Sequence, residues 1–188
     1  MPKRIVIIGN SATGKTTLAR ELASILGCPH IERDAIQWQA EWKARSDDEF
    51  REHVIEAVKG DRWVADGNFS RVRNIMWGRA DTLIWLDYSL WFIMWRLTKR
   101  SWQRIRQQEV LWNGNRETWR HLLASDGVFM WTLKAHFRHH REYPQLFLEP
   151  QFQHLQVVRL RSERATHEWL KAIIDTQQDA KGFRHEPI

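Results

Sequence analysis

Residues 4–17 read RIVIIGNSATGKTT and combine a strand signal, a glycine-rich turn and the start of a helix. The apolar run Ile5–Ile8 predicts a short buried β-strand. Gly9, four intervening residues and then Gly14-Lys15-Thr16 have the spacing of a phosphate-binding loop. A helical pattern follows at once, from Thr17 to Leu26. Because strand and helix flank the motif, we interpret it as a nucleotide-phosphate site rather than a chance glycine-rich turn.

Each part of this loop has a physical role in holding phosphate. Glycine lets the backbone turn tightly and approach an anion without a Cβ in the way. Consecutive N–H groups then point at phosphate oxygens, reinforced by the N-terminus of the helix. Lys15 is expected to reach the β- and γ-phosphates of ATP, and the Thr16 hydroxyl to coordinate Mg²⁺. The expected ATP-binding residues of the loop are Gly9, Asn10, Ser11, Ala12, Thr13, Gly14, Lys15, Thr16 and Thr17.

Composition limits the classes of protein to which the chain can belong. Its 188 residues, 43% of them hydrophobic, fit one α/β domain over residues 1–178 with a polar tail at 179–188. The net charge of +6 favours anionic partners, either nucleotides or nucleic acids. The single cysteine, Cys28, excludes an internal disulfide and any multi-cysteine metal site. With no signal peptide and no bilayer-spanning apolar stretch visible, we expect a cytoplasmic protein without a membrane partner.

Strand and helix signals alternate along the rest of the chain. Further strands are expected at 29–32, 62–66, 82–87 and 154–160. Helical patterns are expected at 46–58, 69–77, from Ser89 past residue 106, at 118–124, at 128–142 and after Ser162. Alternation of this kind predicts an α/β fold in which helices cover both faces of a doubly wound parallel sheet.

Carboxylates follow three of the expected strands, at the sheet edge that faces ligand in such folds. Asp66 ends the third strand, and we favour it over a turn-forming Asp-Gly as the acid that holds Mg²⁺ through water. Asp87, at the end of the fourth strand, is the second choice. Asp34, after the second strand, is a candidate for Mg²⁺ or for orienting the phosphoryl acceptor, and is equally consistent with a solvated loop acid.

Basic and aromatic residues supply the remaining candidates. Arg96 and Arg100 share a face of the helix that begins at Ser89, and either form a solvated surface or close on the transferring phosphates. The stretch at about 96–124 would serve as a short helical lid. The acceptor pocket is expected in segments 34–45 and 68–78, with candidate substrate residues Asp34, Trp38, Asn68, Arg71 and Arg73. A metal site from His136, His139 and His140 is disfavoured, because adjacent histidines point in different directions on a helix.

The order of these landmarks resembles the nucleoside-monophosphate-kinase branch of P-loop proteins. Within it, the chain looks like the small kinase-like ATPases described as adenylate-kinase-related or as DNA topology modulation proteins. The residues that carry the resemblance are Gly9–Thr17, Asp34 with Trp38, 66–71, the strand 82–87, Arg96 with Arg100, and 112–117. The resemblance implies a three-layer α/β/α sandwich with strand order 2-3-1-4-5, ATP in the phosphate loop, and an adenine site near Arg161.

One departure from the adenylate kinases concerns the acceptor. The pair Asp66-Gly67 resembles their Asp-Gly, but the Pro-Arg that follows it there is replaced by Phe69-Ser70-Arg71. The acceptor arginine is therefore displaced or absent, which argues against AMP as the acceptor.

The sequence supports one main function and two competitors. We expect a Mg²⁺-ATP-dependent phosphotransferase that acts on a small molecule or a nucleotide. One alternative is an ATPase or ATP-gated module that acts with nucleic acid, since the net charge is positive and aromatic side chains can stack on bases. The other is a nucleotide-binding protein that hydrolyses ATP only slowly. Steep weakening of binding with salt would distinguish the nucleic-acid alternative. The sequence identifies neither the acceptor nor the oligomeric state.

Overall fold

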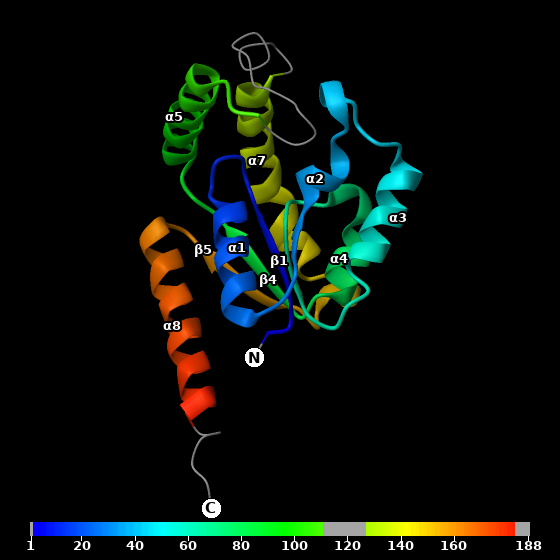
Figure 1. Cartoon of the computed structure of the whole chain (residues 1–188), viewed down its shortest axis with the longest axis vertical. Helices are drawn as coiled ribbons and strands as arrows, with labels where there is room; N and C mark the ends of the chain where they lie inside the picture. Colours follow the sequence, from blue (N-terminus) through cyan, green and yellow to red (C-terminus); the bar gives the residue numbers. More distant parts are fainter. Residues whose placement is uncertain (1, 111–126, 183–188) are drawn as a thin grey trace, which may run out of the picture.

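The computed structural model describes residues 2–110 and 127–182 of the chain. Its centre is one sheet of five parallel strands in the order β2-β3-β1-β4-β5 (Figure 1). The strands are β1 (Arg4–Gly9), β2 (His30–Glu32), β3 (Trp63–Asp66), β4 (Thr82–Leu86) and β5 (Gln156–Leu160). The strand order is the one that the resemblance implies, and it places the phosphate-binding loop at the centre of the sheet edge.

Helices cover both faces of the sheet, as expected for a three-layer sandwich (Figure 1). The α-helices are α1 (Lys15–Leu26), α2 (Arg33–Gln37), α3 (Asp47–Ala57), α4 (Arg73–Arg79), α5 (Leu90–Gln107), α7 (Val128–Leu146) and α8 (Glu163–Gly182). Short 3₁₀ turns are η1 (Ala40–Trp42), η2 (Ser70–Val72) and η4 (Pro150–Phe152). Among the described residues, no helix is long and apolar enough to cross a membrane.

The central strands alternate between two apolar cores. Ile5 and Ile7 of β1 face α1 and α8, whereas Val6 and Ile8 face the core formed with α3, α4 and α7. All four side chains are fully buried, as expected for a strand that has helices on both sides. Burial on both faces fixes the register of β1, because a shift by one residue would exchange the two cores.

Several element boundaries follow local capping. Ser46 and Glu49 form a capping box at the start of α3, and Ser162 Oγ accepts a hydrogen bond from the Ala165 N–H at the start of α8. Both helix starts are where the sequence predicts them. The expected loop at 111–117 and helix at 118–124, with most of the proposed lid, lie outside the described residues.

Several boundaries differ from the sequence prediction. The helix expected at 69–77 is the turn η2 followed by α4, and α8 continues to Gly182, into the expected polar tail. A short helix, α2, replaces the expected loop after β2. β5 begins at Gln156, two residues later than expected, because the turn after η4 continues to Leu155, whose N–H bonds to the Phe152 carbonyl. α7 passes through Pro144 to Leu146, since packing of its last turns on the sheet offsets the missing hydrogen bond.

Trp77 is the centre of the aromatic core beneath α7. It is fully buried, and its ring lies 6.1 Å from that of Tyr143, 5.8 Å from Phe147 and 5.1 Å from Phe152, measured between centroids. These contacts attach α7 and η4 to α4, and therefore hold one wall of the site described below.

We predict that Trp77→Ala lowers the free energy of unfolding by about 3–5 kcal/mol, because it removes buried surface and leaves a cavity. Trp91→Ala is the matched control, since Trp91 is 85% exposed; it should change stability by no more than about 0.5 kcal/mol. Urea denaturation followed by circular dichroism measures both. Equal losses in the two variants would contradict this account of the core.

Candidate active site

The loop between β1 and α1 leaves the sheet at Gly9, where a side chain has no room. A Cβ on Gly9 would lie 2.7 Å from the Leu86 carbonyl oxygen, and its φ of +150° disfavours other residues. Hydrogen bonds then shape the loop: the Gly9 N–H donates to Asn68 Oδ1 at 3.0 Å, and Thr13 Oγ1 donates to the Asn10 carbonyl at 2.8 Å. Asn10 Nδ2 donates to the Thr132 carbonyl of α7 at 2.8 Å. The loop is thus fixed to both β3 and α7.

Lys15 lies over the loop with its ammonium partly buried. Nζ donates to the Asn10 carbonyl at 2.6 Å. Burial lowers the pKa of Lys15 to about 8, although the carboxylates of Asp66 and Asp34 act in the opposite direction. The ammonium is therefore partly desolvated and lies along the loop, where it can bind phosphate oxygens.

Thr16, Asp66 and His30 form a chain of short hydrogen bonds. Thr16 Oγ1 donates to Asp66 Oδ2 at 2.6 Å, while His30 Nε2 lies 2.7 Å from Asp66 Oδ1. The hydroxyl and carboxylate oxygens converge beside the loop, and oxygen ligands of this kind are those that Mg²⁺ prefers. The donor set therefore fits a magnesium ion. His30 was not singled out from the sequence; its position on β2, next to β3 in the sheet, is the only signal for it.

Asp87 is engaged elsewhere. Arg159 donates to its Oδ2 from Nε at 2.8 Å and from Nη2 at 2.6 Å, and His140 Nε2 lies 2.9 Å from its Oδ1. This network joins β4, β5 and α7. Asp66, rather than Asp87, is therefore the strand-end acid that the structure brings to Thr16.

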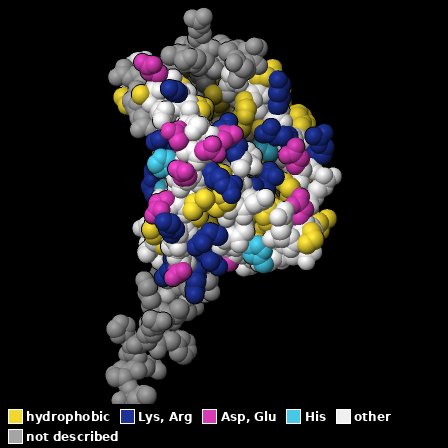
Figure 2. All heavy atoms as spheres, turned by 90° about the vertical axis from the view of Figure 1, so that its right-hand side faces the viewer, with side chains coloured by type: hydrophobic (Ala, Val, Ile, Leu, Met, Phe, Trp, Pro, Cys, Tyr) yellow, Lys and Arg dark blue, Asp and Glu magenta, His cyan; other side chains and the backbone are white. Residues whose placement is uncertain are grey.

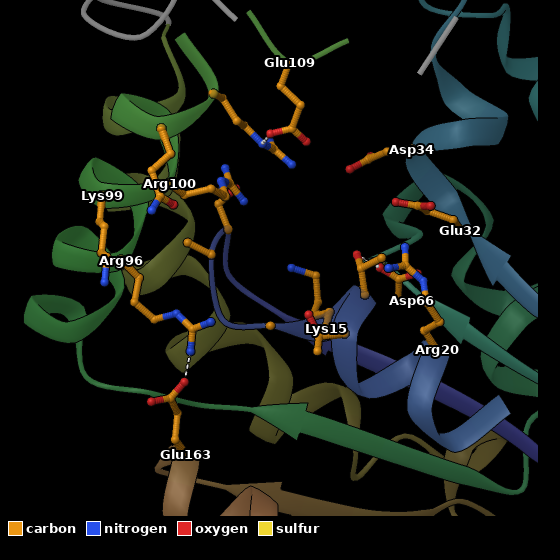
Figure 3. A pocket seen from close by; sticks show the side chains of 18 of the residues that line it. Lys15, Arg20, Glu32, Asp34, Asp66, Arg96, Lys99, Arg100, Glu109 and Glu163 are labelled. Carbon is orange, nitrogen blue, oxygen red and sulfur yellow. Dashed lines mark hydrogen bonds and ion pairs between the residues drawn. The ribbon is translucent and has the colours of Figure 1, made fainter. Parts of the chain in front are cut away.

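A cavity beside the phosphate-binding loop, which we call the loop cavity, has a volume of about 940 Å³. Figure 3 shows the cations of α5 at one side of this cavity and Lys15 in the middle. At the other side lie the carboxylates of Glu32, Asp34 and Asp66. Arg96 forms an ion pair with Glu163, the first residue of α8. The cations on α5 complement the negative charge of a polyphosphate. The lining residues are Ser11, Ala12, Gly14, Lys15, Thr16, Thr17, Arg20, Glu32, Asp34, Asp66, Gly67, Trp95, Arg96, Lys99, Arg100, Gln103, Arg104, Glu109, Val110 and Glu163.

A second cavity, the side cavity, has a volume of about 300 Å³ and lies between the β3 end, α4 and α7. It shares Ser11, Lys15, Asp34 and Gly67 with the loop cavity. The two cavities therefore meet at Lys15 and Asp34. The residues that line only the side cavity are Arg33, Asn68, Phe69, Ser70, Arg73, Trp131, Arg138, His139, Glu142 and Tyr143.

Not every expected site residue lies at these cavities. Arg71 forms an ion pair with Asp47 of α3 at 2.8 Å on the exposed surface, and Trp38 packs edge-on against Trp42 at 5.7 Å between ring centroids. Arg71, Trp38 and Arg161 line neither the loop cavity nor the side cavity. By contrast, Asn68 and Arg73 both line the side cavity. The two arginines, two positions apart, point to different surroundings because the chain changes from η2 to α4 between them.

α7 contributes residues that the sequence did not assign to a substrate site. His139 is buried, with its ring stacked on Tyr143 at 4.5 Å between centroids. Burial, with some help from the nearby Arg138 charge, lowers the pKa of His139 to about 3, so the imidazole is neutral. His140 points instead to Asp87. The sequence raised these histidines only as metal ligands, and their divergence matches the helical geometry expected for adjacent positions.

Comparison with known proteins identifies the fold. No model of a known protein family matches the chain, and no curated protein matches it in sequence. Among solved structures, a shikimate kinase from Bacteroides thetaiotaomicron is 13% identical with a TM-score of 0.54, and covers 95% of this chain and 99% of its own. A gluconokinase from Sinorhizobium meliloti 1021 is 16% identical with a TM-score of 0.51, and covers 98% of each chain.

A shikimate kinase from Acinetobacter baumannii, solved in complex with shikimate, is 14% identical with a TM-score of 0.52, and covers 95% of this chain and 94% of its own. The fold is therefore that of the P-loop kinases, over nearly the whole chain. The likeness does not extend to the narrower adenylate-kinase-related or DNA topology modulation family that the sequence resembles, and that resemblance stays a prediction.

Because the pKa of Lys15 is lowered in the folded protein, the free energy of unfolding should depend on pH. The unfolded chain holds this proton up to its ordinary pKa of 10.5, whereas the folded protein releases it near pH 8. Below pH 8 the folded state bears the full cost of the desolvated charge, and between these values the wild type gains stability as pH rises. Lys15→Met should therefore raise the free energy of unfolding at pH 7 by about 2 kcal/mol, and the difference should shrink by pH 10.

Urea denaturation of the ligand-free protein at pH 7 and pH 10 measures this difference. Lys134→Met, at an exposed position on α7, is the control and should show no such pH-dependent gain. A Lys15→Met advantage that is equal at both pH values would show that the ammonium is not desolvated as described.

Proposed function

We propose that the protein is a kinase that transfers the γ-phosphoryl group of Mg²⁺-ATP to a small-molecule acceptor. The observation that carries this proposal is the junction of the two cavities at Lys15 and Asp34. Phosphoryl transfer needs a donor and an acceptor on opposite sides of the transferred group, held in line. The loop cavity suits the donor, and the side cavity suits the acceptor.

The loop cavity holds the nucleotide in this proposal. Loop N–H groups and Lys15 bind the β- and γ-phosphates, and Arg96 and Arg100 neutralise charge on the transferred group. Arg96 is held by Glu163, but a guanidinium has five N–H donors, so it can bind phosphate as well. We place the adenine end of ATP near Arg161 and Glu163, where β5 leads into α8.

Thr16 and Asp66 would hold the magnesium ion, through the hydroxyl oxygen and the carboxylate oxygen that now share a hydrogen bond. When bound, the ion would neutralise part of the negative charge of the phosphates. His30 positions the Asp66 carboxylate from the other side.

Asp34 supplies the acceptor chemistry. Its carboxylate lines both cavities, is 43% exposed, and accepts a hydrogen bond from Arg33 at 2.8 Å. When the acceptor is a hydroxyl, its oxygen forms a bond to the γ-phosphorus, the bond from that phosphorus to the bridging oxygen of ADP breaks, and the hydroxyl proton passes to Asp34. ADP and the phosphorylated acceptor leave.

Acceptor-dependent ATP consumption tests the proposal. The acceptors to screen are shikimate and gluconate, which the names of the similar structures suggest, together with sugars, polyols and nucleoside monophosphates. One of them should raise ADP release well above the water background. Lys15→Ala should reduce that turnover by at least about 100-fold, because it removes a cation from the transferred group. ATP binding without any acceptor-stimulated turnover would contradict the kinase proposal.

Asp34→Asn tests the role of the carboxylate with the acceptor found in that screen. The amide keeps the shape of the side chain but cannot accept the proton, so kcat should fall by about 10²- to 10⁴-fold while the Kd for ATP stays unchanged. Asp61→Asn, at an exposed position, is the control and should behave as the wild type. Unchanged kcat in Asp34→Asn would remove Asp34 from the mechanism.

One observation favours the nucleic-acid alternative enough to include it in the assay. Trp91, Trp95 and Trp102 on α5 are 85%, 56% and 56% exposed, and exposed aromatics can stack on bases. The face formed by α3 and α4, which does not carry these tryptophans, shows basic and acidic side chains interspersed (Figure 2), so this alternative concerns α5 alone. If single-stranded DNA stimulates ATP turnover where small acceptors do not, and high salt abolishes the effect, the alternative function replaces the kinase.

A further inference from the structure

The side cavity carries more positive charge than its own carboxylates neutralise. Arg33 is ion-paired with Asp34, and its guanidinium lies 5.7 Å from the centre of the Phe50 ring. Neither Arg73 nor Arg138 forms an ion pair with any of the described residues, and both line the cavity. Glu142, the other acid there, approaches Arg141 instead, at 3.9 Å. Two guanidinium groups are therefore left to bind an anion.

Arg73 is held in place by its surroundings rather than by a carboxylate. Its guanidinium lies 5.1 Å from the centre of the Trp77 ring, and its Nε is buried without a hydrogen-bond partner. A buried, unpartnered donor on a fixed side chain is costly to the folded protein, and an acidic ligand would remove part of this cost. The planar fork of arginine suits a carboxylate in particular, which it binds through two parallel hydrogen bonds.

The neutral groups in the cavity suit hydroxyls. The imidazole of His139 is buried and uncharged, so it presents one hydrogen-bond donor and one acceptor. Burial raises the pKa of Tyr143, which keeps its phenol protonated. Groups of this kind bind ligand hydroxyls without adding charge to the site.

The size of the side cavity limits the acceptor. Its volume is about 300 Å³, roughly a third of that of the loop cavity. A compact acid with a few hydroxyl groups fits this space.

We infer that the acceptor is a small hydroxy acid whose acidic group is bound by Arg73 and Arg138 and whose reacting hydroxyl lies at Asp34 and Lys15. This inference rests on the proposed function, since it assigns the substrate class of the same site. Asp34 and Lys15 line both cavities. The reacting hydroxyl can therefore contact the Asp34 carboxylate in the side cavity while the phosphoryl group approaches it from the loop cavity.

The first experiment measures binding without turnover. Isothermal titration calorimetry is carried out on the protein saturated with Mg²⁺ and a non-hydrolysable ATP analogue, with shikimate against methyl shikimate, gluconate against glucose, glycerate against glycerol, and AMP. At least one acid should bind 10-fold or more tightly than its neutral counterpart, and more tightly than AMP.

The second experiment uses variants on one helix. Arg138→Ala should raise the KM of the preferred acid, or its Kd, by about 10- to 100-fold, because it removes a charge-assisted hydrogen bond. The Kd of the ATP analogue should stay unchanged. Arg138→Lys should restore only part of the affinity, since it keeps the charge but not the fork. Lys134→Ala, at an exposed position on the same helix that lines neither cavity, is the matched control and should have no effect.

The outcomes separate this inference from the proposed function. If a neutral polyol or AMP is the preferred acceptor, if no acid binds, or if Arg138→Ala leaves the affinity for the acid unchanged, the hydroxy-acid inference is overturned while kinase activity can still stand. If acids bind through Arg138 but no acceptor stimulates ATP consumption, the proposed function fails instead.

Discussion

The contact between Gly9 and β4 is the constraint on which the site depends. β1 pairs with β3 and β4, so its last residue, Gly9, lies against Leu86 of β4. A Cβ on Gly9 would lie only 2.7 Å from the Leu86 carbonyl oxygen, which is too close for any side chain. The chain can leave the sheet there only with the backbone geometry of glycine. Because β1 is central in the sheet, the loop that follows lies between the ends of β2 and β3 on one side and α5 on the other. Lys15 and Thr16, the first residues of α1, therefore meet Asp66 and Asp34 at this edge of the sheet.

The loop keeps this shape through polar contacts, and they have a cost in stability. The Asn10 carbonyl accepts from both Thr13 and Lys15, while the Asn10 side chain donates to α7. The same residue thus holds the ammonium and ties the loop to the helix that forms the wall of the side cavity. The lowered pKa of Lys15 shows that burial opposes its charge. Sites that bind phosphate commonly give up stability in this way, since the charge is compensated only when the ligand is present.

The sequence predicts the parts of the site that depend on local order. The phosphate loop, the strand that precedes it and Asp66 follow from spacing and from apolar runs, and the strand order follows from the resemblance. It does not predict the role of His30. The contact between His30 and Asp66 joins β2 to β3, and these strands are far apart in the sequence and adjacent only in the folded sheet. The sequence also assigns Arg71 and Arg73 to the same pocket, whereas the chain turns between them and only Arg73 reaches the side cavity. Helical periodicity predicts that α7 is half-buried. It does not predict that Arg138 and His139 line this cavity, because the orientation of α7 depends on its packing against Trp77 and Trp85.

Donor and acceptor recognition are built from different kinds of structure. The donor side uses backbone N–H groups of the loop and Lys15 at the start of α1, with Arg96 and Arg100 added from α5. The acceptor side uses side chains from α4 and α7, brought together only by the aromatic core around Trp77. A substitution at Arg73 or Arg138 therefore alters what the side cavity accepts without disturbing the loop, whereas a change at Gly9 would disturb both. The fold can thus keep one mechanism of phosphoryl transfer while its acceptor varies, and the residues that identify the acceptor must be sought on α4 and α7 rather than in the motif.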